Sequence, residues 1–141
     1  MQRTVAVLNQ KGGVGKTTVT LGLASAAHAA GRRLLVVDLD PQAASSWVLG
    51  VDPGGVSVAE ALAVKRANTR DHVVPSARSD QIHVLPGSAD LQSLEDGHVR
   101  RLRRLVEQVE DDYEAVLLDC PPSLGDLTRS ALVASAHALI V

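Results

Sequence analysis

The chain has 141 residues, of which 45% are hydrophobic and 21% are charged, the balance of an ordinary globular domain that is long enough to bury a core. Its net charge of −2 provides no overall attraction for nucleic acid, and one tryptophan, one tyrosine and no phenylalanine exclude a single-strand-binding surface built on base stacking. A single cysteine excludes both a disulfide framework and a cysteine-based zinc site.

The first predicted element is a buried strand at residues 4–8, a short apolar run rich in β-branched side chains. Residues 19–30 are rich in alanine and leucine and predict a helix. Gly31 should end that helix, because glycine readily adopts a positive φ. The glycine-rich segment 10–18 therefore lies on a strand-to-helix turn.

This glycine-rich turn is typical of a phosphate-binding loop. Without Cβ atoms the backbone N–H groups can surround an anion, and the following helix directs its positive dipole end to the same point. We expect Lys16 to contact the outer phosphates and the Thr17 hydroxyl to bind Mg²⁺. A plain glycine-rich turn is the alternative, but it does not require Gly-Lys-Thr at the head of a helix. The expected contacts with a nucleotide come from Gly12, Gly13, Val14, Gly15, Lys16, Thr17 and Thr18.

A second apolar run at residues 34–38 predicts a strand parallel to the first, since strands covered on both faces read as continuous apolar runs. The helix between the two strands makes a right-handed strand–helix–strand unit. Ligand groups gather at the carboxyl ends of such strands, so Asp38 and Asp40 should lie near the phosphate loop. Capping of the strand end is the alternative role for both side chains.

The middle of the chain predicts shorter elements. Helices are expected over residues 43–50, 58–62, 88–97 and 99–109, and a third strand over residues 81–85. Ser57 should cap the second of these helices, with Glu60 as its capping-box partner. We assign no element to the polar segment 65–80.

The helix predicted over residues 99–109 has two faces. Its apolar side chains recur at helical spacing and should face the core: Val99, Leu102, Leu105, Val106 and Val109. Its four arginines fall mostly off this stripe: Arg100, Arg101, Arg103 and Arg104. We interpret them as a solvated basic face with Glu107 and Glu110 as partners, and a nucleic-acid patch is the alternative.

A fourth strand at residues 114–118 runs into Asp119, and an apolar strand that ends in aspartate downstream of a phosphate loop is a Walker B arrangement. We expect Asp119 to hold Mg²⁺ through water. Asp126 should cap a helix that runs to about residue 136, and residues 137–141 should form a fifth strand at or near a sheet edge. Together these elements predict one α/β domain over residues 1–141, with three α/β/α layers and a mostly parallel sheet.

The phosphate loop departs from the general pattern in one place, where Gln10 replaces the first glycine and Lys11 follows. This form resembles the deviant Walker A loop of the ParA/MinD family of P-loop ATPases. Residues 37–42 resemble the switch I segment of that family, and residues 118–125 resemble its Walker B and switch II segments. The Asp-Pro-Gln and Asp-x-Pro-Pro-Ser-Leu-Gly forms look most like the chromosome- and plasmid-partitioning branch. The resemblance covers this chain but only the N-terminal part of a usual family member, so we expect a domain shortened on its C-terminal side.

The resemblance implies an ATPase that uses ATP and Mg²⁺ and dimerises on ATP. It implies that Lys11 reaches across the homodimer to the partner's nucleotide; from spacing alone, a solvated loop lysine is the alternative. Lys16 would be catalytic as well, and Asp40 is our candidate for orienting the attacking water. Asp38 is expected to support the outer shell of the metal, and the Gly125 amide to sense the γ-phosphate.

The expected function is a nucleotide-gated switch in chromosome or plasmid partitioning, with a ParB-like activating partner. Full-length relatives bind non-specific DNA through basic residues beyond the part that matches, so we do not expect strong DNA binding from this chain. Apolar runs too short for a membrane span and no signal-peptide layout make a cytoplasmic location the expectation, nucleoid-associated if the chain is ParA-like. A MinD-like positioning ATPase and a nucleotide-binding interaction module without turnover are the alternatives. Cys120 is expected to be a small buried residue and not an iron–sulfur ligand.

Overall fold

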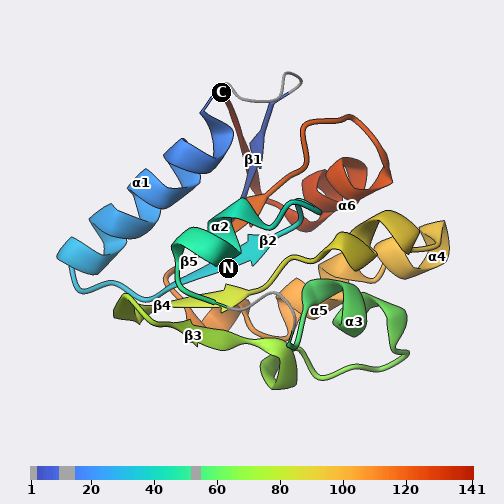
Figure 1. The fold of residues 1–141 in the computed structure, drawn as a ribbon, viewed down its shortest axis with the longest axis horizontal. Coiled ribbons are helices and arrows are strands. Elements are labelled where there is room, and N and C mark those ends of the chain that lie inside the picture. The colour runs from blue at the N-terminus through green and yellow to red at the C-terminus, as the bar shows by residue number, and fades with distance from the viewer. Residues whose placement is uncertain (1–2, 10–14, 52–54) are drawn as a thin grey trace.

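The computed structural model describes residues 3–9, 15–51 and 55–141, and its centre is a six-stranded sheet in the order β3-β4-β2-β5-β1-β6 (Figure 1). Every pairing is parallel except that of β3 with β4. The prediction of a mostly parallel α/β sheet is confirmed. The strands are β1 (Thr4–Leu8), β2 (Leu34–Asp38), β3 (Val74–Ser76), β4 (Ser79–Leu85), β5 (Ala115–Asp119) and β6 (His137–Ile140).

Helices cover both faces of the sheet and complete the three layers (Figure 1). The α-helices are α1 (Lys16–Ala29), α2 (Ala44–Val48), α3 (Val58–Ala63), α4 (Asp96–Val99), α5 (Leu102–Glu107) and α6 (Asp126–Ala134). Short 3₁₀ turns lie at Thr69–His72, Ala89–Ser93 and Glu110–Asp112.

Strand β2 shows how the sequence produces the two cores. All five of its residues are buried, as expected for a strand covered on both faces. Leu35 and Val37 belong to the larger cluster, with side chains of α3, α5 and α6, whereas Leu34 and Val36 belong to the smaller cluster on the α1 side. This alternation follows from the two-residue repeat of a strand.

The segment to which we assigned no element contains a strand. Residues 74–76 form β3, which pairs antiparallel with β4 at the edge of the sheet. Pro75 suits this position, because a proline lacks the N–H that a central strand needs. Strand β4 begins at Ser79, two residues before its predicted start.

The helix predicted over residues 88–97 is wrong. The chain forms a 3₁₀ turn at Ala89–Ser93 and then the short helix α4, and α5 begins only at Leu102. The core stripe of the next predicted helix is nevertheless buried throughout, because Arg100 and Arg101 keep near-helical backbone angles between α4 and α5. The spacing of apolar residues therefore predicted burial correctly where it misplaced the helix boundary.

The predicted caps and surface pairs have mixed outcomes. Ser57 caps α3 as predicted, accepting the Glu60 N–H at 3.1 Å. Gly125, and not Asp126, is the N-cap of α6, and Asp126 is the first helical residue, paired with Arg129 at 3.2 Å. This helix also ends at Ala134, two residues before its predicted end.

The arginines of the predicted basic face lie mostly in solvent. Arg103 pairs with Glu107 at 2.9 Å, as predicted. Glu110 instead accepts the Thr4 hydroxyl at 3.2 Å, and Arg101 donates to the Leu62 carbonyl at 2.9 Å. Of the two predicted acidic partners, Glu107 therefore pairs with an arginine of this face, whereas Glu110 contacts strand β1.

Strand β6 lies at the edge of the sheet, as predicted, and within the described residues its one partner strand is β1. All four of its residues are exposed, Ile140 to 78%. In the part of the chain that the structure describes, no helix combines the length and the apolar character that a membrane crossing needs.

Candidate nucleotide-binding site

The candidate site begins where β1 leads, through the glycine-rich segment, into α1. Gly15 is the N-cap of α1 and has φ of 92°, a conformation that L side chains rarely adopt, so glycine is needed here for its backbone. Four of the predicted nucleotide contacts lie outside the described residues: Lys11, Gly12, Gly13 and Val14. Of the others, Lys16 opens α1, followed by the partly exposed Thr17 and the exposed Thr18.

Lys16 is the only lysine side chain within the described residues that is buried; its residue is 7% exposed. Its ammonium donates to Asp119 Oδ1 and lies 3.9 Å from Asp40 Oδ2. A cation at the head of a helix thus faces two carboxylates from the ends of β5 and β2. This arrangement concentrates charge at the point where the sequence predicts phosphates.

Asp119 and Asp38 lie opposite each other in the register of β5 and β2, and neither is exposed to solvent. Asp119 accepts from Lys16 on Oδ1 and from the Ser45 hydroxyl on Oδ2. The environment of Asp38 contains neutral donors. It accepts the Ser46 hydroxyl at 2.7 Å and the Ser46 N–H at 2.9 Å on Oδ2, and the Asp40 N–H at 3.1 Å on Oδ1.

These environments shift the proton affinities of two groups. Burial raises the pKa of Asp38 to about 6; the hydrogen bonds from Ser46 oppose this rise, and the charge of Asp119 adds to it. Burial likewise raises the pKa of the Cys120 thiol to about 12, with Asp119 adding to the rise. Cys120 is fully buried, as predicted, and such a thiol is a poor nucleophile and metal ligand.

Asp40 lies on the turn after β2 and is partly buried, whereas Asp38 and Asp119 are fully buried. Its Oδ1 accepts the Gln42 N–H at 2.9 Å, and its carbonyl accepts the Ala43 N–H at 2.9 Å. Ala43 has φ of 54°, an uncommon value for a residue other than glycine, and leads directly into α2. The turn therefore holds Asp40 beside Lys16. It also brings Ser45 and Ser46, at the start of α2, within hydrogen-bonding distance of the aspartates that end β5 and β2.

Three site residues were missed from the sequence: Ser45, Ser46 and Gly87. Gly87 follows β4, and its N–H donates to the Ser46 hydroxyl at 3.0 Å. A Cβ there would lie 2.9 Å from the carbonyl oxygens of both Asp38 and Asp40, so a side chain would push the switch I segment away. The available signal was a pair of small polar residues just after an aspartate-rich strand end, and a glycine just after the neighbouring strand.

Gly125, the predicted sensor of the γ-phosphate, is exposed at the start of α6. The segment before it is anchored by the Thr128 hydroxyl, which donates to the Ser123 carbonyl at 2.6 Å. The structure thus places Gly125 on an exposed turn downstream of Asp119.

The donor set fits a metal that arrives with a nucleotide. Among the described residues, no group of three or more histidine, cysteine, aspartate or glutamate side chains is arranged to hold a metal ion. Mg²⁺ usually takes one or two carboxylates and completes its shell with phosphate oxygens and water. Asp38 and Asp119 provide two such carboxylates at the strand ends, and the Thr17 hydroxyl provides one further oxygen atom.

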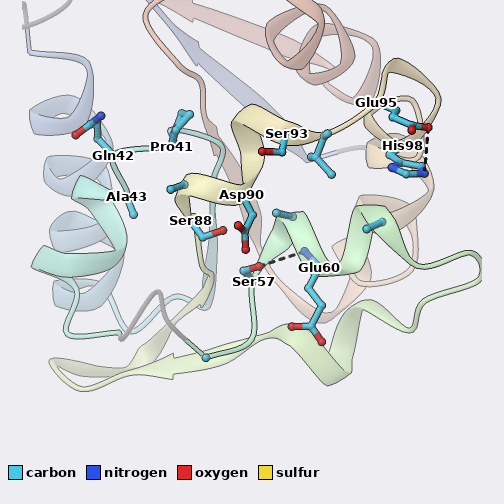
Figure 2. Close-up of a pocket in the computed structure, with 15 residues that line it drawn as sticks. Pro41, Gln42, Ala43, Ser57, Glu60, Ser88, Asp90, Ser93, Glu95 and His98 are labelled. Carbon is cyan, nitrogen blue, oxygen red and sulfur yellow. Dashed lines mark hydrogen bonds and ion pairs between the residues drawn. The ribbon is translucent and has the colours of Figure 1, made fainter.

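A hollow of about 780 Å³ borders the end of the switch I segment. Figure 2 shows residues 41–43 on one side of it, α3 on another, and Ser88 and Asp90 between them. Its described lining residues include the acidic side chains of Glu60, Asp90 and Glu95 and contain no lysine or arginine. The strand ends are acidic too but have the ammonium of Lys16, whereas the lining of this hollow offers phosphates no such cation.

Comparison with known proteins identifies the family. A family model described as an AAA domain matches residues 2–141. The sporulation initiation inhibitor protein Soj of Bacillus subtilis is 35% identical over 99% of this chain and 58% of its own length, and the chromosome-partitioning ATPase Soj of Treponema pallidum is 38% identical over 99% and 56%. The chain belongs to the ParA/MinD family of P-loop ATPases. It spans little more than half the length of these curated relatives.

Solved structures similar to this ParA/MinD-family chain have the same fold. A cobyrinic acid a,c-diamide synthase from Mycobacterium smegmatis, with bound ATP analog and magnesium, is 36% identical with a TM-score of 0.87 over 99% of this chain and 59% of that one. The septum site-determining protein MinD of Pyrococcus horikoshii, complexed with Mg-ADP, is 31% identical with a TM-score of 0.86 over 100% and 58%. The P-loop ATPase fold predicted from the sequence is thereby confirmed.

Proposed function

We propose that this chain is the nucleotide-binding part of a ParA-like switch that binds ATP with Mg²⁺ and hydrolyses the ATP. The observation that supports the proposal most directly is the position of Lys16, buried at the head of α1 against Asp119 and close to Asp40. The relatives add weight, because the synthase and MinD structures carry an ATP analog or ADP with magnesium.

The proposed chemistry assigns one task to each side chain. Lys16 turns from Asp119 to the outer phosphates and neutralises their charge, while the loop amides hold the phosphate oxygens. Thr17 would bind Mg²⁺ and Asp119 would hold it through water, with Asp38 supporting its outer shell; the ion would supply charge neutralisation at the phosphates. Asp40 accepts a hydrogen bond from the attacking water and orients it.

Lys11 and Gly125 have proposed roles in dimerisation and in the response to the nucleotide. Lys11 contributes its charge to the nucleotide of the partner subunit in an ATP-dependent homodimer, as an arginine finger does in other ATPases. Gly125 reports the γ-phosphate to the switch II segment through its backbone amide.

The proposed role is chromosome or plasmid partitioning in the cytoplasm, with a ParB-like activating partner and DNA as the surface that the full-length protein binds. Its support is the naming of the Treponema relative as a chromosome-partitioning ATPase and of a 34% identical Myxococcus xanthus relative as a chromosome partitioning protein. A MinD-like positioning role is the second candidate, favoured by the similarity to the MinD structure. Stimulation of turnover by DNA or by lipid vesicles separates the two.

The test of the proposed function is ATP binding and turnover by the purified chain. Calorimetry with ATP should detect binding that tightens with Mg²⁺ and weakens with EDTA, and a phosphate-release assay should detect slow hydrolysis without any added acceptor molecule. Hydrolysis without an acceptor distinguishes a switch from a synthase. Binding without phosphate release would instead support an interaction module, and no binding in either condition would overturn the proposal.

A further inference from the structure

We infer that Ser45 is a positioning residue that orients the Asp119 carboxylate toward Mg²⁺ and ties the switch I segment to the Walker B strand. The inference rests on the proposed function, because it concerns how the chain would hold the metal. It adds a residue that belongs to none of the phosphate-loop, switch I or Walker B motifs.

The geometry behind this inference is a carboxylate held on both oxygens. Asp119 accepts from Lys16 on Oδ1 and from Ser45 on Oδ2, and Ser45 and Asp119 are both fully buried. In the proposed reaction Lys16 leaves Asp119 for the phosphates, which frees Oδ1 to face the metal's water. The Ser45 hydroxyl then remains on Oδ2 and fixes the plane of the carboxylate. A buried carboxylate without that donor would lose both its orientation and part of its hydrogen bonding.

The position of Ser45 in the chain gives this contact a second consequence. Ser45 lies in the first turn of α2, directly after the switch I segment and the strained backbone of Ala43. Asp119 ends β5, which pairs with β2. The Ser45 hydroxyl is therefore a side-chain link between the segment that carries Asp40 and the strand end that carries the metal carboxylate. Displacement of α2 would disturb both.

Ser46 provides the comparison that separates this role from simple packing. It has the same size, the same complete burial and the next position in α2, but its hydroxyl donates to Asp38 and accepts from Gly87. Both serines thus join α2 to a strand end by buried hydrogen bonds. Only Ser45 contacts the carboxylate that faces Lys16.

The test measures how strongly Mg²⁺ tightens the binding of ADP, which avoids any dependence on turnover. The full 141-residue chain is titrated calorimetrically with ADP in EDTA and in saturating Mg²⁺, and the ratio of the two dissociation constants gives the coupling between metal and nucleotide. Ser45→Ala should reduce this ratio about 10-fold, the usual scale for a residue behind a metal ligand, and leave binding in EDTA within about 2-fold of wild type. Ser46→Ala should reduce the ratio less than Ser45→Ala does, because Asp38 is proposed only to support the outer shell of the metal. Ser57→Ala, which removes a buried serine that caps α3, should lower stability but leave the ratio unchanged.

A double-mutant cycle separates action through Asp119 from an indirect effect. In an Asp119→Asn background, Ser45→Ala should reduce the ratio no further, because the group that it positions has been altered. Trp47, the single tryptophan and 75% exposed on α2, gives an independent signal, and its emission should respond to Mg²⁺ in wild type more than in Ser45→Ala. If Ser45→Ala does not fold by circular dichroism, Ser45→Cys keeps the approximate size with a weaker donor and should shift the ratio in the same direction.

The outcomes distinguish the two proposals. A wild-type chain whose ADP binding ignores Mg²⁺ overturns the proposed function and this inference with it. A wild type that responds to Mg²⁺ and a folded Ser45→Ala or Ser45→Cys variant with an unchanged ratio overturn the inference alone. An additive loss in the Asp119→Asn background overturns the assignment to Asp119.

Discussion

Asp38 and Asp119 occupy equivalent places, each the last residue of a buried parallel strand and each opposite the other in the sheet, yet their surroundings differ. Asp119 faces the ammonium of Lys16, whereas Asp38 is held by the neutral donors of Ser46 and the Asp40 backbone. Both are joined to α2, by Ser45 and Ser46 respectively. Together with the proposed function, this difference predicts that Asp119 faces the nucleotide, whereas Asp38 supports the outer shell of the metal and shapes the turn that presents Asp40.

The largest expected effect comes from Lys16→Ala, which removes the cation that faces Asp119. We expect ATP affinity to fall about 1,000-fold, since truncating one partner of a buried charge pair typically costs 2–5 kcal/mol. The unfolding free energy should also fall by about 3–5 kcal/mol, because Asp119 is left buried without a cation. Calorimetry and urea denaturation measure the two effects.

Two further variants sharpen this test. Lys65→Ala removes an exposed lysine and should change neither quantity. Adding Asp119→Asn to Lys16→Ala should recover part of the lost stability, because the unpaired charge is removed. If Asp38→Asn recovers as much, Lys16 compensates the two carboxylates alike and the contrast between them is wrong.

Asp40→Ala should have the next largest effect and should act on turnover alone. Asp40 is proposed to orient the attacking water, so phosphate release should fall about 100-fold or more while ATP affinity stays within a few-fold of wild type. The measurement is single-turnover hydrolysis beside calorimetric binding. Equal losses in binding and turnover would instead make Asp40 a structural residue like Asp38.

Much of the fold could be predicted from local sequence patterns, whereas several side-chain contacts in the site could not. The apolar runs predicted β1 and β2, because burial on both faces leaves a clear signal in the sequence. Strand β3 was missed because three residues that include Pro75 carry no such repeat. The aspartates at the strand ends were found by the same rule that applies to all parallel sheets.

The different hydrogen-bond partners of Asp38 and Asp119 could not be predicted from the sequence. Ser45 and Ser46 are adjacent and chemically identical, and only the backbone turn at Ala43 decides which hydroxyl reaches which strand. Gly87 lies 41 residues from Ser46 along the chain, and its contact depends on the strand order. Tertiary placement of this kind leaves no periodic pattern.

The pH dependence of stability tests the Asp38 side of the comparison. Its pKa is about 6 in the folded protein against 3.8 for an unperturbed aspartate, so the folded state binds more protons between these values. The stability that a protonated Asp38 contributes is fully present below about pH 4. It should be lost as pH rises through about 6, by on the order of 3 kcal/mol.

The measurement is urea denaturation from pH 4 to pH 7, in EDTA and without nucleotide, on wild type and Asp38→Asn. Because asparagine does not titrate, the unfolding free energy of wild type minus that of the variant should decrease across this range. A difference that stays constant with pH would show that Asp38 has the same pKa in the folded and unfolded states, and its neutral surroundings would then not distinguish it from Asp119.

The smallest expected effect is that of Ser46→Ala, and it bears on whether the two aspartates act separately. The substitution removes the hydroxyl that donates to Asp38 and leaves the Gly87 N–H without that acceptor. We expect a loss of about 2 kcal/mol in the unfolding free energy, the usual cost of buried hydrogen-bonding groups left without a partner.

Ser57→Ala, which removes the cap of α3 far from the strand ends, is the matched control and should cost about 1 kcal/mol. The coupling of Mg²⁺ to ADP should be unchanged in Ser57→Ala and should fall less in Ser46→Ala than in Ser45→Ala, because Asp38 is proposed only to support the outer shell of the metal. If Ser46→Ala weakens that coupling as much as Ser45→Ala does, then Asp38 and Asp119 respond to α2 as one unit, and the metal site must be assigned to the pair.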